Sequence, residues 1–86
     1  MKILFYGSVI DYANGENFFD SKNSSNIRTL IDELGNHFGQ SFKEFLLGDG
    51  TCFFLVNGKG IMTIGGIDTK ICPEDKVEIL PFVEAG

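Results

Sequence analysis

The chain has 86 residues and a mass of 9.5 kDa, enough for one domain with a modest core. Hydrophobic residues make up 43% of it, nine of them phenylalanine, a composition that excludes an intrinsically disordered chain. Seven Lys and Arg against twelve Asp and Glu leave a net charge of −5. Without a basic stripe, neither nucleic acid nor an anionic membrane is an expected partner.

Two cysteines, Cys52 and Cys72, are too few for a disulfide scaffold or an iron–sulfur cluster. We expect both to behave as small, half-buried hydrophobic residues. The apolar start at residues 1–7 lacks a cleavage site and is interpreted as a strand rather than a signal peptide. No run approaches the roughly 20 apolar residues of a membrane span, so we expect a soluble, cytoplasmic protein.

In chain order, the first predicted element is a strand over residues 2–10, which are rich in β-branched and aromatic side chains. Asn14-Gly15 is a strong hairpin signal, so a short strand over residues 17–20 should pair back on the first.

An amphipathic helix is predicted next, because apolar residues recur at spacings of three and four. They are Ile27, Leu30, Ile31, Leu34 and Phe38. Ser24, Ser25 or Asn26 can cap its first turn with a side-chain oxygen. Gly35 or Gly39 can end it in a left-handed turn.

The second half of the chain is predicted to hold one short helix and three strands. The helix covers residues 42–47, and the strands cover residues 51–56, 61–64 and 76–82. Turn residues separate them at 57–60, 65–66 and 73–75. One substantial helix must then cover one face of a mixed sheet, which is an α+β layer arrangement.

Alternation along the strands makes both faces of this sheet apolar. One face carries Ile3, Phe5, Phe54, Val56, Val77 and Ile79, and the other carries Leu4, Tyr6, Phe53, Leu55, Leu80 and Phe82. Since only one face can receive the helix, the second face lies under the short helix and loops, is ordinary apolar surface, or binds a partner.

Catalytic and metal-binding patterns are missing. His37 is the only histidine, and we expect it to be solvated near the end of the helix. No His/Cys cluster has zinc spacing, and Gly58-Lys59-Gly60 is too short for a phosphate-binding loop. We therefore expect neither a metal site nor an enzyme active alone.

The sequence ends with Ala85-Gly86, shortly after a predicted strand. A C-terminal carboxylate is an anion at neutral pH and a poor electrophile, but an acyl-adenylate made from it accepts sulfur or an amine. Glycine suits such a tail because it enters a narrow channel at any backbone angle.

Four segments carry a family resemblance: KILFYG at residues 2–7, IRTLIDEL at 27–34, FLVNGK at 54–59 and PEDKVEILPFVEAG at 73–86. In this order the chain resembles the MoaD/ThiS-type β-grasp sulfur carriers, and most closely the small subunit of molybdopterin synthase. The family commonly ends in a DGDEV turn, an apolar strand, PPV and Gly-Gly. Here Phe82 stands at the usual second proline and Ala85 at the penultimate glycine.

The resemblance implies a ubiquitin-like domain over residues 1–86 with a flexible tail at 83–86. An E1-like enzyme would consume ATP to adenylate Gly86, and a sulfur donor protein would convert it to a thiocarboxylate. The tail would then enter a larger synthase subunit for molybdenum or tungsten cofactor biosynthesis, with no stably bound cofactor. Contacts in that channel would come from Pro81, Phe82, Val83, Glu84 and Ala85. The partner-binding face would be Leu4, Tyr6, Phe53, Leu55 and Leu80.

Two alternatives remain open. The same tail would serve a sulfur carrier of the thiamine or another pathway, or a ubiquitin-like protein modifier. Because Ala85 adds a methyl group where glycine is usual, a β-grasp interaction module whose tail is never activated is the other alternative.

Overall fold

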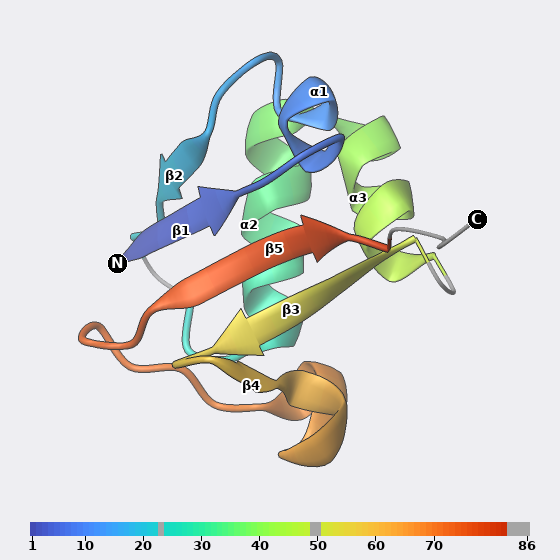
Figure 1. Ribbon diagram of the computed structural model, residues 1–86. Coiled ribbons are helices and arrows are strands. Elements are labelled where there is room, and N and C mark those ends of the chain that lie inside the picture. Colours follow the sequence, from blue (N-terminus) through green and yellow to red (C-terminus); the bar gives the residue numbers. More distant parts are fainter. Residues whose placement is uncertain (23, 49–50, 83–86) are drawn as a thin grey trace.

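The computed structural model describes residues 1–22, 24–48 and 51–82, in which a five-stranded sheet packs against helices (Figure 1). Its strands are β1 (Lys2–Phe5), β2 (Phe18–Asp20), β3 (Cys52–Val56), β4 (Lys59–Gly60) and β5 (Val77–Pro81). The helices are α1 (Val9–Tyr12), α2 (Ile27–Phe38) and α3 (Gln40–Leu47), and η1 (Ile61–Thr63) and η2 (Gly66–Asp68) are 3-10 turns. The strand order is β2-β1-β5-β3-β4, with β1 and β5 parallel and the other pairs antiparallel. This confirms the predicted α+β class.

Helix α2 has the predicted bounds because its signals are local. The Asn26 side chain accepts a 2.8 Å hydrogen bond from the Thr29 N–H, and the Thr29 hydroxyl accepts one of 3.2 Å from the Asn26 N–H. This capping box satisfies backbone donors at the start of the helix. Gly39, with φ 114°, ends α2 and precedes α3. The buried face of α2 is Ile27, Leu30, Ile31 and Leu34.

Helix α3 begins two residues earlier than predicted and closes over the core as expected. Phe42 on α3 is 1% exposed. Its ring lies 5.6 Å from Phe5 of β1 and 5.3 Å from Phe38 of α2, both edge-on. These aromatic contacts join both helices to the sheet.

The prediction of one strand over residues 2–10 is wrong, because β1 ends at Phe5 and α1 follows. Gly7 turns the chain with φ +57°, and the helical turn then places Val9 and Ala13 on one side, both fully buried. The Asn14-Gly15 turn therefore follows a short helix instead of forming a tight hairpin. Strand β2 still pairs antiparallel with β1, as predicted.

The predicted strand at residues 61–64 is also wrong, because η1 occupies this position. Ile61 is buried in the core, whereas the next residue, Met62, is 85% exposed. The Thr63 hydroxyl donates a 2.8 Å hydrogen bond to the Gly60 carbonyl and stabilises the turn. A short apolar run does not distinguish a strand from a helical turn by its pattern alone.

The two sheet faces differ as the alternation predicts. Ile3, Phe5, Phe54, Val56, Val77 and Ile79 are all buried, at 6% exposure or less. In Figure 1 helices α2 and α3 lie behind the sheet, and no described helix crosses its front. We call this front the open face; it carries Leu4, Tyr6, Phe53, Leu55, Glu78, Leu80 and Phe82.

Candidate functional site

The last strand, β5, lies in the middle of the sheet, between β1 and β3. Its register pairs Glu78 with Leu4 of β1 and Leu80 with Phe53 of β3. One further bond of 3.2 Å, from the Phe82 N–H to the Thr51 carbonyl, extends the ladder past the end of the strand. The chain is therefore held in the sheet up to Phe82, where the predicted tail begins.

Pro81 and Phe82 are the predicted channel contacts within the described part of the chain. The Phe82 ring packs edge-on against Phe53 with centroids 5.5 Å apart, yet Phe82 stays 58% exposed. Pro81 lies against Gly7, where an added Cβ would be 2.8 Å from the proline Cγ. Val83, Glu84, Ala85 and Gly86 lie outside the described residues.

The predicted partner-binding residues lie together on the open face. Leu4, Phe53, Leu55 and Leu80 are half-buried, and Tyr6 is 39% exposed. The Tyr6 hydroxyl donates a 2.8 Å hydrogen bond to the Glu78 carboxylate. That hydrogen bond, with smaller contributions from burial and the nearby negative charge, raises the pKa of Tyr6. The open face is thus apolar apart from the hydrogen-bonded pair of Tyr6 and Glu78.

Glu78 was not predicted as a site residue, although its alternation with Leu80 places it on the open face. Lys76 lies 3.8 Å from the Glu78 carboxylate and supplies a partly compensating positive charge. The signal that could have identified Glu78 was its position between the two apolar residues Val77 and Ile79.

An apolar hollow beside Phe82 was also missed. It has a volume of about 460 Å³ and is lined by Phe82 and by residues of α3, β3, β4, η1 and η2, including Leu47, Phe53 and Met62. Leu47 is 54% exposed and Met62 is 85% exposed. No sequence signal identifies this hollow, because segments far apart in the sequence line it.

The cysteines give a mixed outcome. Cys52 is half-buried as predicted, and burial raises the pKa of its thiol. Cys72 is exposed, so that prediction is wrong; it lies in the turn before β5, where its N–H donates a 2.8 Å bond to Asp75. Across residues 1–22, 24–48 and 51–82, no group of His, Cys, Asp or Glu is arranged to hold a metal ion.

None of the helices in the described part of the chain has the length and apolar character to cross a membrane.

A mixed sheet on one main helix, with a central last strand, defines a ubiquitin-like β-grasp domain. The ThiS family model matches residues 3–86, so the chain belongs to the ThiS family. This confirms the family resemblance of the sequence.

Solved structures share this fold at low sequence identity. A chain of the Amycolatopsis orientalis BexX/CysO complex matches with a TM-score of 0.81 and 17% identity, over 99% of this chain and 98% of that one. Small archaeal modifier protein 1 from Methanosarcina acetivorans matches with a TM-score of 0.78 and 22% identity, over 99% of this chain and 94% of that one. A candidate molybdopterin converting factor, subunit 1, from Pyrococcus furiosus matches with a TM-score of 0.70 and 23% identity, over 95% of both chains. No curated protein matches the sequence.

Proposed function

We propose that this protein is a sulfur carrier that acts as the small subunit of a molybdopterin synthase, with Gly86 as the residue that carries sulfur. The observation that supports this most directly is the ThiS family match, which extends through Gly86. The structure adds a last strand that ends beside an open apolar face. The likeness to the Pyrococcus furiosus converting factor subunit favours the molybdopterin pathway.

The proposed chemistry uses the carboxylate of Gly86. On an E1-like enzyme it attacks ATP, forms a carboxylate–phosphate bond and releases pyrophosphate. Sulfur from a donor protein, at the oxidation level of sulfide, then forms a C–S bond at the same carbon while the C–O bond to AMP breaks. The product is a thiocarboxylate, a sulfur nucleophile able to attack a pterin precursor inside a larger subunit.

In this proposal the described residues bind the partner proteins and position the start of the tail. Leu4, Phe53, Leu55 and Leu80 offer apolar area to the activating enzyme and the larger subunit. The Tyr6–Glu78 pair adds one fixed donor–acceptor group to that face. Pro81 and Phe82 start the tail at the middle of the sheet, and Val83, Glu84 and Ala85 reach the partner's channel. The chain supplies the acyl group, and its partners supply the catalysis.

The test is intact-mass spectrometry of the protein after incubation with ATP, sulfide and a candidate E1-like enzyme. We expect a gain equal to the difference between one sulfur and one oxygen, located in the C-terminal peptide. A variant lacking Gly86 is the control and should show no gain. If the variant gained the same mass, or if sulfur transfer survived without Gly86, the proposal would be wrong.

A protein modifier is the second candidate, because a structural neighbour is a small archaeal modifier protein. It requires the same adenylate but delivers the acyl group to a lysine, so an isopeptide between Gly86 and another protein would identify it.

The interaction module is the third candidate. It predicts that no adenylate forms and that Ala85→Gly changes nothing, whereas a mass gain restored by Ala85→Gly would show that the methyl group blocks activation.

A further inference from the structure

Strand β2 forms one edge of the sheet, and part of its backbone has no partner strand. The Asn17 carbonyl and the Ser21 N–H bond to the backbone of residues 1–5 at 3.0 and 2.7 Å. Because antiparallel strands alternate bonded and non-bonded pairs, the N–H and C=O groups of Phe18 and Asp20 point away from β1. These groups make no hydrogen bond to the residues that the structure describes. They are free to pair with an added strand.

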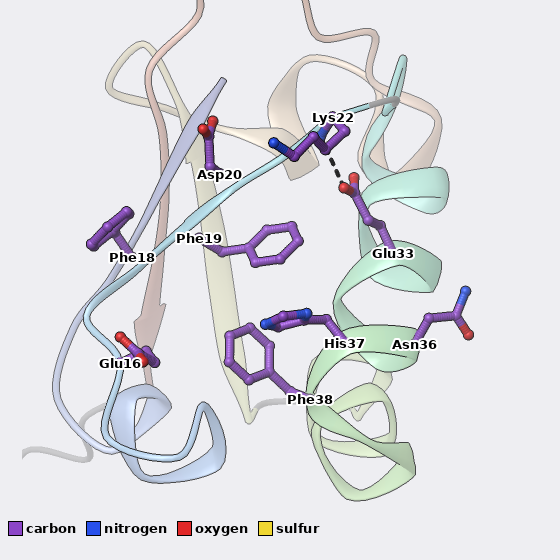
Figure 2. A pocket seen from close by; sticks show the side chains of 9 residues that line it. All are labelled: Glu16, Phe18, Phe19, Asp20, Lys22, Glu33, Asn36, His37 and Phe38. Carbon is purple, nitrogen blue, oxygen red and sulfur yellow. Dashed lines mark hydrogen bonds between the residues drawn. The ribbon is translucent and has the colours of Figure 1, made fainter.

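A groove of about 560 Å³ separates this edge from helix α2 (Figure 2). The Phe19 ring points from β2 towards the helix, and His37 and Phe38 point back towards it from α2. The Phe19 ring centroid lies 4.9 Å from His37 and 5.7 Å from Phe38. The floor of the groove is therefore aromatic, and it lies directly beside the unpaired backbone.

The rim of the groove is acidic. Glu16 lies two residues before β2 and Asp20 is its last residue, with Glu33 across the groove on α2. Lys22 is the one Lys or Arg among the residues that line the groove. Asp20 is 3.3 Å from the N-terminal ammonium, and Glu33 accepts three hydrogen bonds. Glu16 has no ionic partner among the described residues.

We infer that β2 and this groove bind an extended segment of a partner protein, added as a strand along the outer edge of β2. Pairing centred on Phe18 places the segment's central residue opposite Phe18. The two residues beside it then turn their side chains into the groove and should be apolar. The residues beyond these face Glu16 and Asp20 and should be basic. The bound segment is therefore five residues long, with a basic residue at each end and apolar residues between them.

A second copy of this chain is a poor occupant of the same edge. Two β2 strands paired about Phe18 would place Glu16 of each chain opposite Asp20 of the other, and like charges across a strand pair repel. Strand β1 separates β2 from β5, so the segment could bind while the open face engages its own partner. The inference does not depend on the proposed function.

The test titrates the isotopically labelled full chain with the synthetic peptide acetyl-Lys-Val-Ile-Val-Lys-amide, followed by NMR. We expect shifts at the amides of Phe18, Asp20 and His37, with slower hydrogen exchange at Phe18. Methylating the isoleucine nitrogen removes the bond to the Phe18 carbonyl and should weaken binding about fivefold. Methylating the first valine nitrogen is the matched control, because that N–H points away from β2 in this register.

A charge swap gives the second measurement. Glu16→Lys should lower the affinity for the lysine-ended peptide about threefold and raise the affinity for its glutamate-ended counterpart by a similar factor. The inference is wrong if no shift occurs up to the solubility limit of the peptide or if shifts fall on the open face. It is also wrong if both methylated peptides lose affinity equally. Concentration-dependent shifts at β2 without peptide would overturn it in favour of self-association.

Discussion

The ring of Phe82 packs edge-on against Phe53, with centroids 5.5 Å apart and planes at 67°. This contact joins the start of the tail to β3 at the border of the open face. Because Phe82 is still 58% exposed, most of its ring is available to a partner. The pair therefore fixes Phe82 against the sheet and also presents an aromatic anchor.

Replacing Phe82 by aspartate should separate binding from folding. A charge at a buried interface anchor costs about 2 kcal/mol or more of binding free energy, or roughly thirtyfold in affinity. The free energy of unfolding should change little, since the side chain is mostly exposed in the free protein. Affinity for the activating enzyme, measured by calorimetry, checks this. Phe82→Leu is the control and should retain most of the affinity; equal affinities for all three proteins would exclude Phe82 from the interface.

Gly7→Ala should destabilise the fold by about 2 kcal/mol, measured by urea unfolding. Gly7 has φ +57°, and the new Cβ would lie 2.8 Å from the Cγ of Pro81. Gly15→Ala is the matched control, because Gly15 also has a positive φ of +85° but no atom within 4 Å of an added Cβ. It should cost about 1 kcal/mol, the backbone penalty alone. Equal losses for both variants would show that the contact with Pro81 contributes nothing.

Glu33 should make the free energy of unfolding depend on pH in the acid range. Partial burial by itself raises the pKa of this carboxyl, but hydrogen bonds from Ser21, Ser24 and the Lys22 N–H outweigh burial, so the pKa is lowered. A lowered pKa stabilises the fold at pH values above the unfolded pKa of about 4.3. That stability is lost as the pH falls through the lower pKa of the folded state.

Urea unfolding at neutral and acid pH measures this effect. Glu33→Gln should be less stable than the wild type at pH 7 and should lose less stability on acidification. Glu44→Gln, on the exposed side of α3, is the control and should follow the wild-type profile. A Glu33→Gln profile parallel to the wild type would show that Glu33 does not carry the acid dependence.

Ile79 and Leu80 test the difference between the two sheet faces, because adjacent residues of β5 point to opposite sides. Ile79 is fully buried, so Ile79→Ala should cost about 3 kcal/mol of unfolding free energy. Leu80 is half-buried on the open face, and Leu80→Ala should cost about 1 kcal/mol. Thermal or urea unfolding of the pair checks this. Similar costs would mean that the open face is as well packed as the core.

Helix α2 and the two sheet faces were predictable because their causes are local. The capping oxygen of Asn26 lies three residues before the N–H it accepts from, and Gly39 ends the helix through its own backbone angle. Strand alternation assigned Ile79 to the core and Leu80 to the open face without any knowledge of their neighbours. The family motifs added the β-grasp connectivity.

Other features depended on contacts between distant segments. Val9 turns into α1 because burial beside α3 and β5 outweighs its preference for a strand, and Ile61 enters η1 for a similar reason. The groove exists only because Phe19 of β2 packs against His37 and Phe38 of α2, which lie 18 and 19 residues further along the chain. Local propensity thus determined helix α2 and the strand faces of this protein. Packing between distant segments decided where each apolar run leaves the sheet and which edge stays open, since the free energy of burial depends on neighbours that no local pattern contains.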